Sequence, residues 1–205
     1  MSAAAFLPAR LSLTSLRSAA AECRGCDLYK DATQTVFGEG RVSARMMLVG
    51  EQPGDSEDRL GHPFVGPAGK LLHNAMERAG ISPGDVYVTN AVKHFKFVER
   101  GKRRIHAKPR AIEIRACKPW LDAEIQVVRP ALIVALGATA AQSLLGSGFR
   151  LLANRGRIIA SVLPLPVLAT VHPSSILRAP DDKTRHREMN KFVEDLQAAQ
   201  AACAA

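Results

Sequence analysis

An apolar run that leads into an acidic turn, at residues 46–55, constrains the fold more than any other part of the chain. Met46 to Val49 are all apolar, which is typical of a buried strand, and the turn Gly-Glu-Gln-Pro-Gly-Asp follows at 50–55. In open α/β sheets, polar ligands bind outside the carboxyl ends of the strands. The turn is therefore either the rim of a ligand site or an ordinary strand-to-loop turn with solvated acids.

Strands and helices alternate along the rest of the sequence. Apolar runs predict four strands, at residues 45–50, 86–90, 132–137 and 167–171. Amphipathic stripes and stop signals predict helices at residues 69–79, 111–128, 138–145 and 183–202. Strands separated by helices form parallel sheets that are covered on both faces. We therefore predict the α/β class, a three-layer α/β/α sandwich with a central, mostly parallel four-stranded sheet.

The length of the chain favours one domain. Of its 205 residues, 47% are hydrophobic, which is enough for one sizeable core. We predict a single domain over residues 1–205, with an amino-terminal helix and a cysteine pair in residues 1–30 and a basic loop inserted at residues 99–109. No apolar run approaches the ~20 residues of a membrane span.

The first twenty residues have two interpretations. They contain Arg10 and Arg17 but no acid, which is the composition of an organellar transit peptide. We favour a plain first helix, because Leu11, Leu16 and Ala20 follow a helical stripe that leads into the cysteine pair. We accordingly expect a cytoplasmic, bacterial-type protein that acts at the nucleoid.

The charge of the chain favours an anionic partner. The formal net charge is +9, and nucleic acid is a commoner partner than a membrane for a chain without a basic amphipathic helix. Surplus charge does not by itself identify the partner, since many basic proteins bind no nucleic acid.

The cysteine pattern suggests a metal site. Cys23 and Cys26 form a C-x-x-C pair, and Cys117 lies far along the chain. Cys203 lies in an Ala-rich tail, where a fraying terminus is a poor place to close a site, so His94 is the better fourth candidate. Three thiolates and one imidazole suit either zinc or a four-iron four-sulfur cluster. Buried free thiols are the remaining alternative.

Four motifs occur in order along the chain. They are Gly-Glu-x-Pro-Gly at 50–54, Gly-x-Pro-Phe-Val-Gly-x-Ala-Gly at 61–69, Thr-Asn-x-Val-Lys at 89–93 and His-Pro-Ser-Ser at 172–175. Together they resemble the uracil-DNA glycosylase superfamily, in particular its iron-sulfur branch known as family four. His94 replaces a cysteine of the family-four pattern and a basic Lys-Arg-Arg-Ile-His segment follows at 102–106. Both features, with Gln52, resemble the UdgX group, whose members become covalently attached to uracil-containing DNA.

This resemblance implies the cofactor and the partner. The cofactor would be one 4Fe-4S cluster, and its ligands would be Cys23, Cys26, His94 and Cys117. The partner would be uracil-containing DNA, single-stranded and also double-stranded, because a base inside a duplex is reached only when its nucleotide is flipped out. A structural cluster and a monomeric protein are the expected defaults.

The resemblance also implies catalytic roles. Breaking an N-glycosidic bond develops positive charge on the sugar and negative charge on the base, so Glu51 suits the first and a neutral His172 suits the second. His106, in the basic segment, would attack the anomeric carbon where water would otherwise attack. The enzyme would then turn over once. Without the resemblance, the segment would read as a phosphate-binding patch with a bystander histidine.

The expected binding residues fall into two groups. Phe64 would stack on the pyrimidine and Asn90 would read its edge. The full set expected to bind substrate is Gln52, Asp55, Phe64, Asn90, Ser174, Ser175 and Arg178. The set expected to bind the DNA backbone is Lys102, Arg103, Arg104 and Lys108.

Some alternatives remain open at this stage. Asp55 and Asp58 are candidate supports for His106 or for the pocket, although Asp58 also fits a solvated surface acid. Ile176 or Leu177 could fill the gap left by a flipped base, and either could belong to the core. The competing functions are a glycosylase that turns over normally and a non-catalytic iron-sulfur module that binds DNA.

Overall fold

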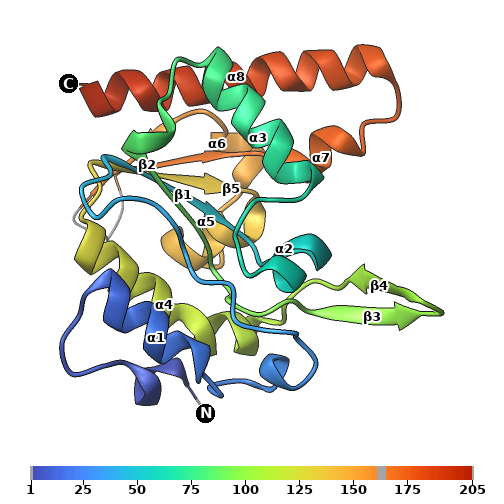
Figure 1. Ribbon diagram of the computed structural model, residues 1–205. Helices are drawn as coiled ribbons and strands as arrows, with labels where there is room; N and C mark the ends of the chain where they lie inside the picture. Colours follow the sequence, from blue (N-terminus) through green and yellow to red (C-terminus); the bar gives the residue numbers. More distant parts are fainter. Residues whose placement is uncertain (1, 161–164, 205) are drawn as a thin grey trace.

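The computed structural model describes residues 2–160 and 165–204 and shows a central sheet with helices on both faces (Figure 1). The strands are β1 (Met46–Gly50), β2 (Val86–Asn90), β3 (Phe97–Arg100), β4 (Arg103–His106), β5 (Leu132–Leu136), β6 (Ile158–Ile159) and β7 (Val167–Thr170). The α-helices are α1 (Leu13–Ala21), α2 (Asp55–Leu60), α3 (Pro67–Arg78), α4 (Ala111–Val128), α5 (Ala138–Leu145), α6 (Leu151–Asn154), α7 (Pro173–Leu177) and α8 (Asp182–Ala204). Short 3₁₀ helices lie at η1 (Ala3–Phe6), η2 (Asp27–Lys30) and η3 (Pro83–Asp85).

Within residues 2–160 and 165–204, the main sheet has five strands in the order β2-β1-β5-β7-β6. All neighbouring pairs are parallel except β6 with β7, which is antiparallel. The predicted α/β/α sandwich is confirmed, and the predicted strand number is corrected from four to five. The additional strand, β6, has only two residues, so it carries too little periodicity to be recognised in the sequence.

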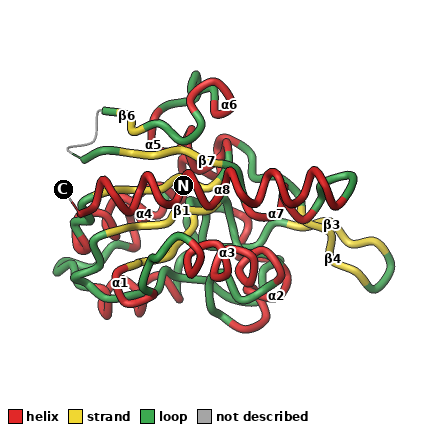
Figure 2. Tube along the Cα trace, turned by 90° about the horizontal axis from the view of Figure 1, so that it is seen from above, coloured by secondary structure: helices red, strands yellow, loops and turns green. Residues whose placement is uncertain are grey.

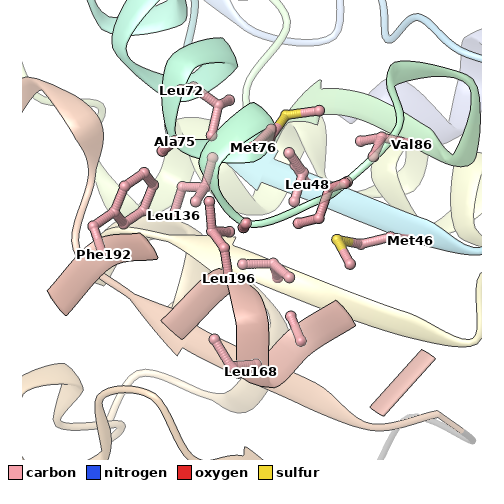
Figure 3. Packing of buried hydrophobic residues seen from close by; sticks show 14 of the residues in the cluster. Met46, Leu48, Leu72, Ala75, Met76, Val86, Leu136, Leu168, Phe192 and Leu196 are labelled. Atoms are coloured by element: carbon pink, nitrogen blue, oxygen red, sulfur yellow. The ribbon is translucent and has the colours of Figure 1, made fainter. Parts of the chain in front are cut away.

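Alternation along β1 builds the two faces of the sheet. Met46 and Leu48 point into one apolar cluster with α3 and α8, whereas Met47 and Val49 point into the cluster under α4 and α5. Figure 3 shows the first cluster, to which Leu196 of α8 and Leu48 of β1 both belong. All five residues of β1 are buried, which explains their unbroken apolar sequence.

A third apolar cluster joins the amino-terminal segment to the body. Leu16 and Ala20 of α1 pack with Trp120 of α4, and Cys23 and Cys117 lie in the same cluster. The view in Figure 1 places α1 beside α4, consistent with this packing.

The basic segment forms a hairpin instead of the expected loop. β3 and β4 pair antiparallel, with Phe97 opposite His106, and the hairpin projects from the body in both views (Figures 1 and 2). Its strands carry several charged residues, which hide the apolar alternation of a strand.

None of the helices in the described ranges is long and apolar enough to cross a membrane.

Candidate active site

The carboxyl ends of four parallel strands open into one cavity of about 710 Å³. Gly50 at the end of β1 is in register with Asn90 at the end of β2, so the residues that follow both strands meet at one edge of the sheet. The cavity walls include Glu51, Phe64, Asn90, His106, His172 and Arg178. The structure therefore gathers in one place side chains that come from four separate motifs of the sequence.

Glu51 and His106 are in direct contact in the wall of this cavity. Nε2 of His106 lies 3.3 Å from Oε1 of Glu51, and the hydroxyl of Thr139 donates a hydrogen bond to the other oxygen, Oε2. Burial alone would raise the pKa of Glu51, but the hydrogen bonds from His106 and Thr139 outweigh it, so the pKa lies below its usual value. Glu51 is therefore a carboxylate at neutral pH, held at both oxygens.

His172 has a defined protonation state. Burial lowers the pKa of its imidazole to about 4, so the ring is neutral at physiological pH. The backbone N–H of Ser174 donates to Nδ1 at 3.2 Å, so Nδ1 is the unprotonated nitrogen and Nε2 carries the proton. His172 therefore offers the cavity a neutral N–H donor.

Phe64 and Asn90 form the inner wall. Phe64 has a positive φ of 56°, and its ring stacks on His172 with 6.3 Å between ring centroids. Gly50 has no side chain here because a Cβ would lie 2.3 Å from Oδ1 of Asn90 and 2.8 Å from the Phe64 ring. Gly69 is required by the same loop, since its Cβ would lie 1.7 Å from the carbonyl oxygen of Phe64. The glycines let an aromatic face and an amide come together.

The hairpin that carries His106 is fixed to α2 by Arg104. Its guanidinium binds Oδ1 of Asp55 at 2.5 Å and Oδ2 of Asp58 at 2.7 Å, and it lies 5.0 Å from the centre of the Phe97 ring. Asp58 is fully buried and also accepts from the backbone N–H of Thr33. Arg104 is thus committed to the protein, which corrects its expected contact with the DNA backbone. Asp58 is not a solvated acid. Asp55 binds Arg104 and is not among the described residues that line the cavity, so its expected contact with substrate stays a prediction.

Gln52 provides a second attachment for the hairpin. Its amide nitrogen donates to the carbonyl oxygens of Lys96 and Ala107, and its amide oxygen accepts from the backbone N–H of Lys96. These contacts occupy a side chain that is only 6% exposed. Gln52 therefore supports both ends of the hairpin and also lines the cavity, where its expected binding of substrate stays a prediction.

Other predicted residues lie on the hairpin or in the lining of the cavity. Lys102, Arg103, Lys108 and Arg178 are exposed, and within the described residues none of the four pairs with a carboxylate. Ser174 is occupied by His172, to which its hydroxyl bonds at 2.8 Å. Ser175 is exposed and its hydroxyl donates to the carbonyl oxygen of His172. The exposed cations remain available to a polyanion.

Three predicted metal ligands lie in one apolar cluster. Cys23 and Cys117 are buried there, and Cys26 packs against them. Sγ of Cys23 accepts from Nε1 of Trp120, and Sγ of Cys117 accepts from the backbone N–H of Lys93, both at 3.2 Å. N–H groups directed at sulfur stabilise a ligating thiolate by hydrogen bonding.

His94 presents one free ring nitrogen. The hydroxyl of Thr35 donates to the carbonyl oxygen of Ala20, so in its 2.9 Å contact with Nε2 of His94 the imidazole is the donor. Nδ1 therefore keeps its lone pair, as a metal-binding imidazole must. No three of the His, Cys, Asp and Glu side chains in the described residues close into a ready metal site. The donor chemistry nevertheless fits a thiophilic metal centre.

Sequence reasoning missed two polar side chains of the cavity, those of Glu57 and Thr139. Glu57 is buried, and its carboxylate accepts from the backbone N–H groups of Gly54 and Gly66 at 3.1 and 2.8 Å, which joins the two glycine-containing loops. Thr139 binds Glu51 from α5. Glu57 falls three residues after Gly54, which is the spacing of a capping box and was the one available signal. Thr139 had no local signal.

The chain is similar in sequence to known uracil-DNA glycosylases. The profile of the uracil DNA glycosylase superfamily matches residues 37–197. The chain is 36% identical to the type-4 uracil-DNA glycosylase of Thermotoga maritima over 182 residues, which is 88% of each chain. It is 36% identical to the type-4 uracil-DNA glycosylase of Pyrobaculum aerophilum over 179 residues, covering 83% of this chain and 87% of the relative. A type-5 uracil-DNA glycosylase of Thermus thermophilus is 35% identical over 159 residues, 68% of each chain.

Proposed function

The chain belongs to the uracil-DNA glycosylase superfamily, and we propose that it excises uracil from DNA and then stays covalently attached, through His106, to the sugar left behind. The observation that carries the covalent step is the 3.3 Å contact between His106 and Glu51. The contact supports a role for the His106 imidazole as the nucleophile beside Glu51. In a glycosylase that turns over, a water molecule would attack from this position. The excision itself is the activity that the family and its type-4 relatives support.

Uracil binding comes first. A flipped base would lie in the cavity against the ring of Phe64, and the amide of Asn90 would bind its polar edge. Asn90 is only 3% exposed, so a base that leaves its donor or acceptor unpaired would lose affinity.

Cleavage of the glycosidic bond follows. The electron pair of the bond between the anomeric carbon and N1 leaves with uracil, and the N–H of neutral His172 stabilises the uracil anion by a hydrogen bond. The Glu51 carboxylate stabilises the positive charge that develops on the sugar. The two groups act at opposite ends of the breaking bond.

Capture is the last step. An imidazole nitrogen of His106 donates its lone pair to the anomeric carbon, and the resulting imidazolium loses its ring proton to Glu51 or to solvent. Uracil takes up a proton from solvent, so the products are free uracil and a neutral imidazole bonded to the sugar. The anomeric carbon of this product carries the imidazole in place of the hydroxyl that water would have supplied. The enzyme molecule cannot react a second time.

The proposed cofactor is a 4Fe-4S cluster. Cys23, Cys26, Cys117 and the free nitrogen of His94 would hold it, and it would connect the amino-terminal segment to α4 and to the loop after β2. When bound it would supply structural cross-linking, since the reaction above requires no electron transfer.

DNA binding is proposed on the face that surrounds the cavity. Lys102 and Arg103 extend along the hairpin, and Lys108 and Arg178 line the cavity itself. These four exposed cations would bind phosphates on both sides of the flipped nucleotide, with a strong dependence on salt. We propose a monomer, because the residues that line the cavity all come from one chain. We further propose that it acts in the cytoplasm, on uracil in single-stranded and in double-stranded DNA.

A denaturing gel tests the proposed function. The protein is mixed with a single-stranded oligonucleotide that contains one uracil, heated in detergent and compared with a thymine control. A heat-resistant, uracil-dependent band that disappears in His106→Ser, with free uracil still released, is the expected result. An alkali-labile abasic product without the band would instead identify a glycosylase that turns over. Neither product would leave a DNA-binding module.

A further inference from the structure

We propose that Thr139 is a positioning residue, whose hydroxyl holds the Glu51 carboxylate in the orientation and charge state that the reaction requires. This inference rests on the role of Glu51 in the proposed function. Thr139 itself would touch neither the uracil nor the sugar, and would act only through the carboxylate.

The Thr139 hydroxyl donates its proton to Glu51. Thr139 is the second residue of α5 and is 4% exposed, and its one hydroxyl proton is directed at Oε2 of Glu51. Ser143, one turn later in the same helix, instead donates to the carbonyl oxygen of Ala140, as serine in a helix commonly does. The Thr139 hydroxyl thus bonds to Glu51, which follows β1, and not to a carbonyl oxygen of its own helix.

Fixing Oε2 also determines where Oε1 lies. With one oxygen held by Thr139, rotation of the carboxylate is restricted, and the other oxygen remains 3.3 Å from Nε2 of His106. A carboxylate placed in this way is available both to the developing positive charge on the sugar and to the imidazole that attacks it.

The charge of Glu51 depends on the same contact. The titratable groups that face Glu51 are His106 from the hairpin and His172 from the loop before α7, and burial opposes ionisation. The imidazole of His106 changes its protonation and then forms a bond during the reaction, whereas a threonine hydroxyl does not titrate. Thr139 is therefore the donor that remains throughout the reaction.

The test compares Thr139→Val with Thr139→Ser and with Ser143→Ala. Thr139→Val keeps the shape of the side chain without the donor, Thr139→Ser keeps the donor, and Ser143→Ala removes a hydroxyl of the same helix outside the cavity. The rate of uracil release in a single turnover is measured on the full-length protein with its native metal content, from pH 4.5 to 8.5, together with the midpoint of thermal unfolding.

We expect Thr139→Val to release uracil about tenfold or more slowly, since a hydrogen bond to a charged group is lost. The acidic limb of its pH profile should move to higher pH, because the pKa of Glu51 rises. Thr139→Ser and Ser143→Ala should follow the wild type in both respects. A Thr139→Val protein with the wild-type rate and profile would overturn the proposal, as would a Thr139→Ser protein as slow as Thr139→Val.

Two further variants, Thr139→Ala and Glu51→Gln, cover a folding defect and a failure of the premise. If Thr139→Val does not fold, Thr139→Ala removes the same donor together with the γ-methyl group and adds no new atom to the site. Glu51→Gln separates this inference from its premise. A fully active Glu51→Gln protein would show that the proposed role of Glu51 is wrong, whereas an inactive Glu51→Gln beside an unaffected Thr139→Val would refute the role of Thr139 alone.

Discussion

Nε2 of His106 lies 3.3 Å from Oε1 of Glu51, although one residue ends a charged hairpin and the other follows a buried strand. The contact depends on the attachment of the hairpin to the body, because in the described part of the chain β3 and β4 pair only with each other. Arg104 supplies one attachment through Asp55 and Asp58, and Gln52 supplies the other. The reactivity of His106 should therefore be sensitive to residues that never meet the DNA.

Arg104→Lys should slow adduct formation by up to about 100-fold at saturating DNA. Lysine keeps the charge but cannot bridge Asp55 and Asp58 as a planar guanidinium does, so His106 would lose its fixed position. The neighbouring exposed residue is the matched control, and Arg103→Gln should weaken DNA affinity and reduce the salt dependence by about one charge without changing the saturated rate. An Arg104→Lys protein that is altered only in affinity would refute this positioning role.

Lys93→Met should lower the free energy of unfolding by about 3–5 kcal/mol, because it leaves the Glu124 carboxylate buried without its counter-ion. The two side chains are fully buried and 2.5 Å apart, and Tyr87 and Thr89 also donate to Glu124. Denaturant unfolding of the single variant is compared with that of Lys93→Met combined with Glu124→Gln. The double variant should recover part of the loss, since a neutral amide oxygen still accepts from Tyr87. A double variant less stable than the single one would count against this account.

The rate of uracil release should show no ionisation of His172 between pH 5 and pH 8, because burial lowers the pKa of His172 in the folded protein to about 4. The unfolded chain binds a proton near the ordinary pKa of 6.5 and the folded chain does not, so stability falls as the pH drops from about 6.5 to 4, by at most about 3 kcal/mol. Unfolding of the wild type and of His172→Gln over this range isolates the contribution. Equal pH dependence in both proteins would show that His172 titrates normally.

Leu177→Ala should slow excision from double-stranded DNA by about tenfold and leave single-stranded DNA unaffected. Leu177 is 39% exposed at the end of α7, beside Arg178, and can fill the stack that a flipped base vacates. Ile176 is only 1% exposed, which makes it a core residue, so Ile176→Ala should instead cost about 2–5 kcal/mol of stability. Equal losses on both DNA substrates would exclude the wedge role of Leu177.

The parts of the fold that sequence could predict are those whose signal is local. β1, β2, β5 and β7 are apolar runs because parallel strands are buried on both faces, and the polar residues that follow them had to meet at one edge. The predicted final helix, at 183–202, differs from α8 by only one or two residues at each end.

The parts that sequence could not predict depend on tertiary contacts. Arg104 looks like its exposed neighbour Arg103, and only the fold shows that two carboxylates of α2 bind one and not the other. Gln52 follows Glu51 directly, yet its amide serves the hairpin. Thr139 lies in a short apolar helix, and its importance follows from the packing of α5 against the end of β1. Each of these side chains has its partner far away in the sequence.

The stoichiometry of uracil release distinguishes covalent capture from repeated turnover. A fixed amount of protein is given an excess of a single-stranded uracil oligonucleotide, and free uracil is counted to completion for the wild type and for His106→Ser. Because each His106 can be consumed once, the account predicts that the wild type stops at about one uracil per protein chain and that His106→Ser continues beyond it. Continued release by the wild type, many uracils for each chain, would contradict covalent capture and leave an ordinary glycosylase.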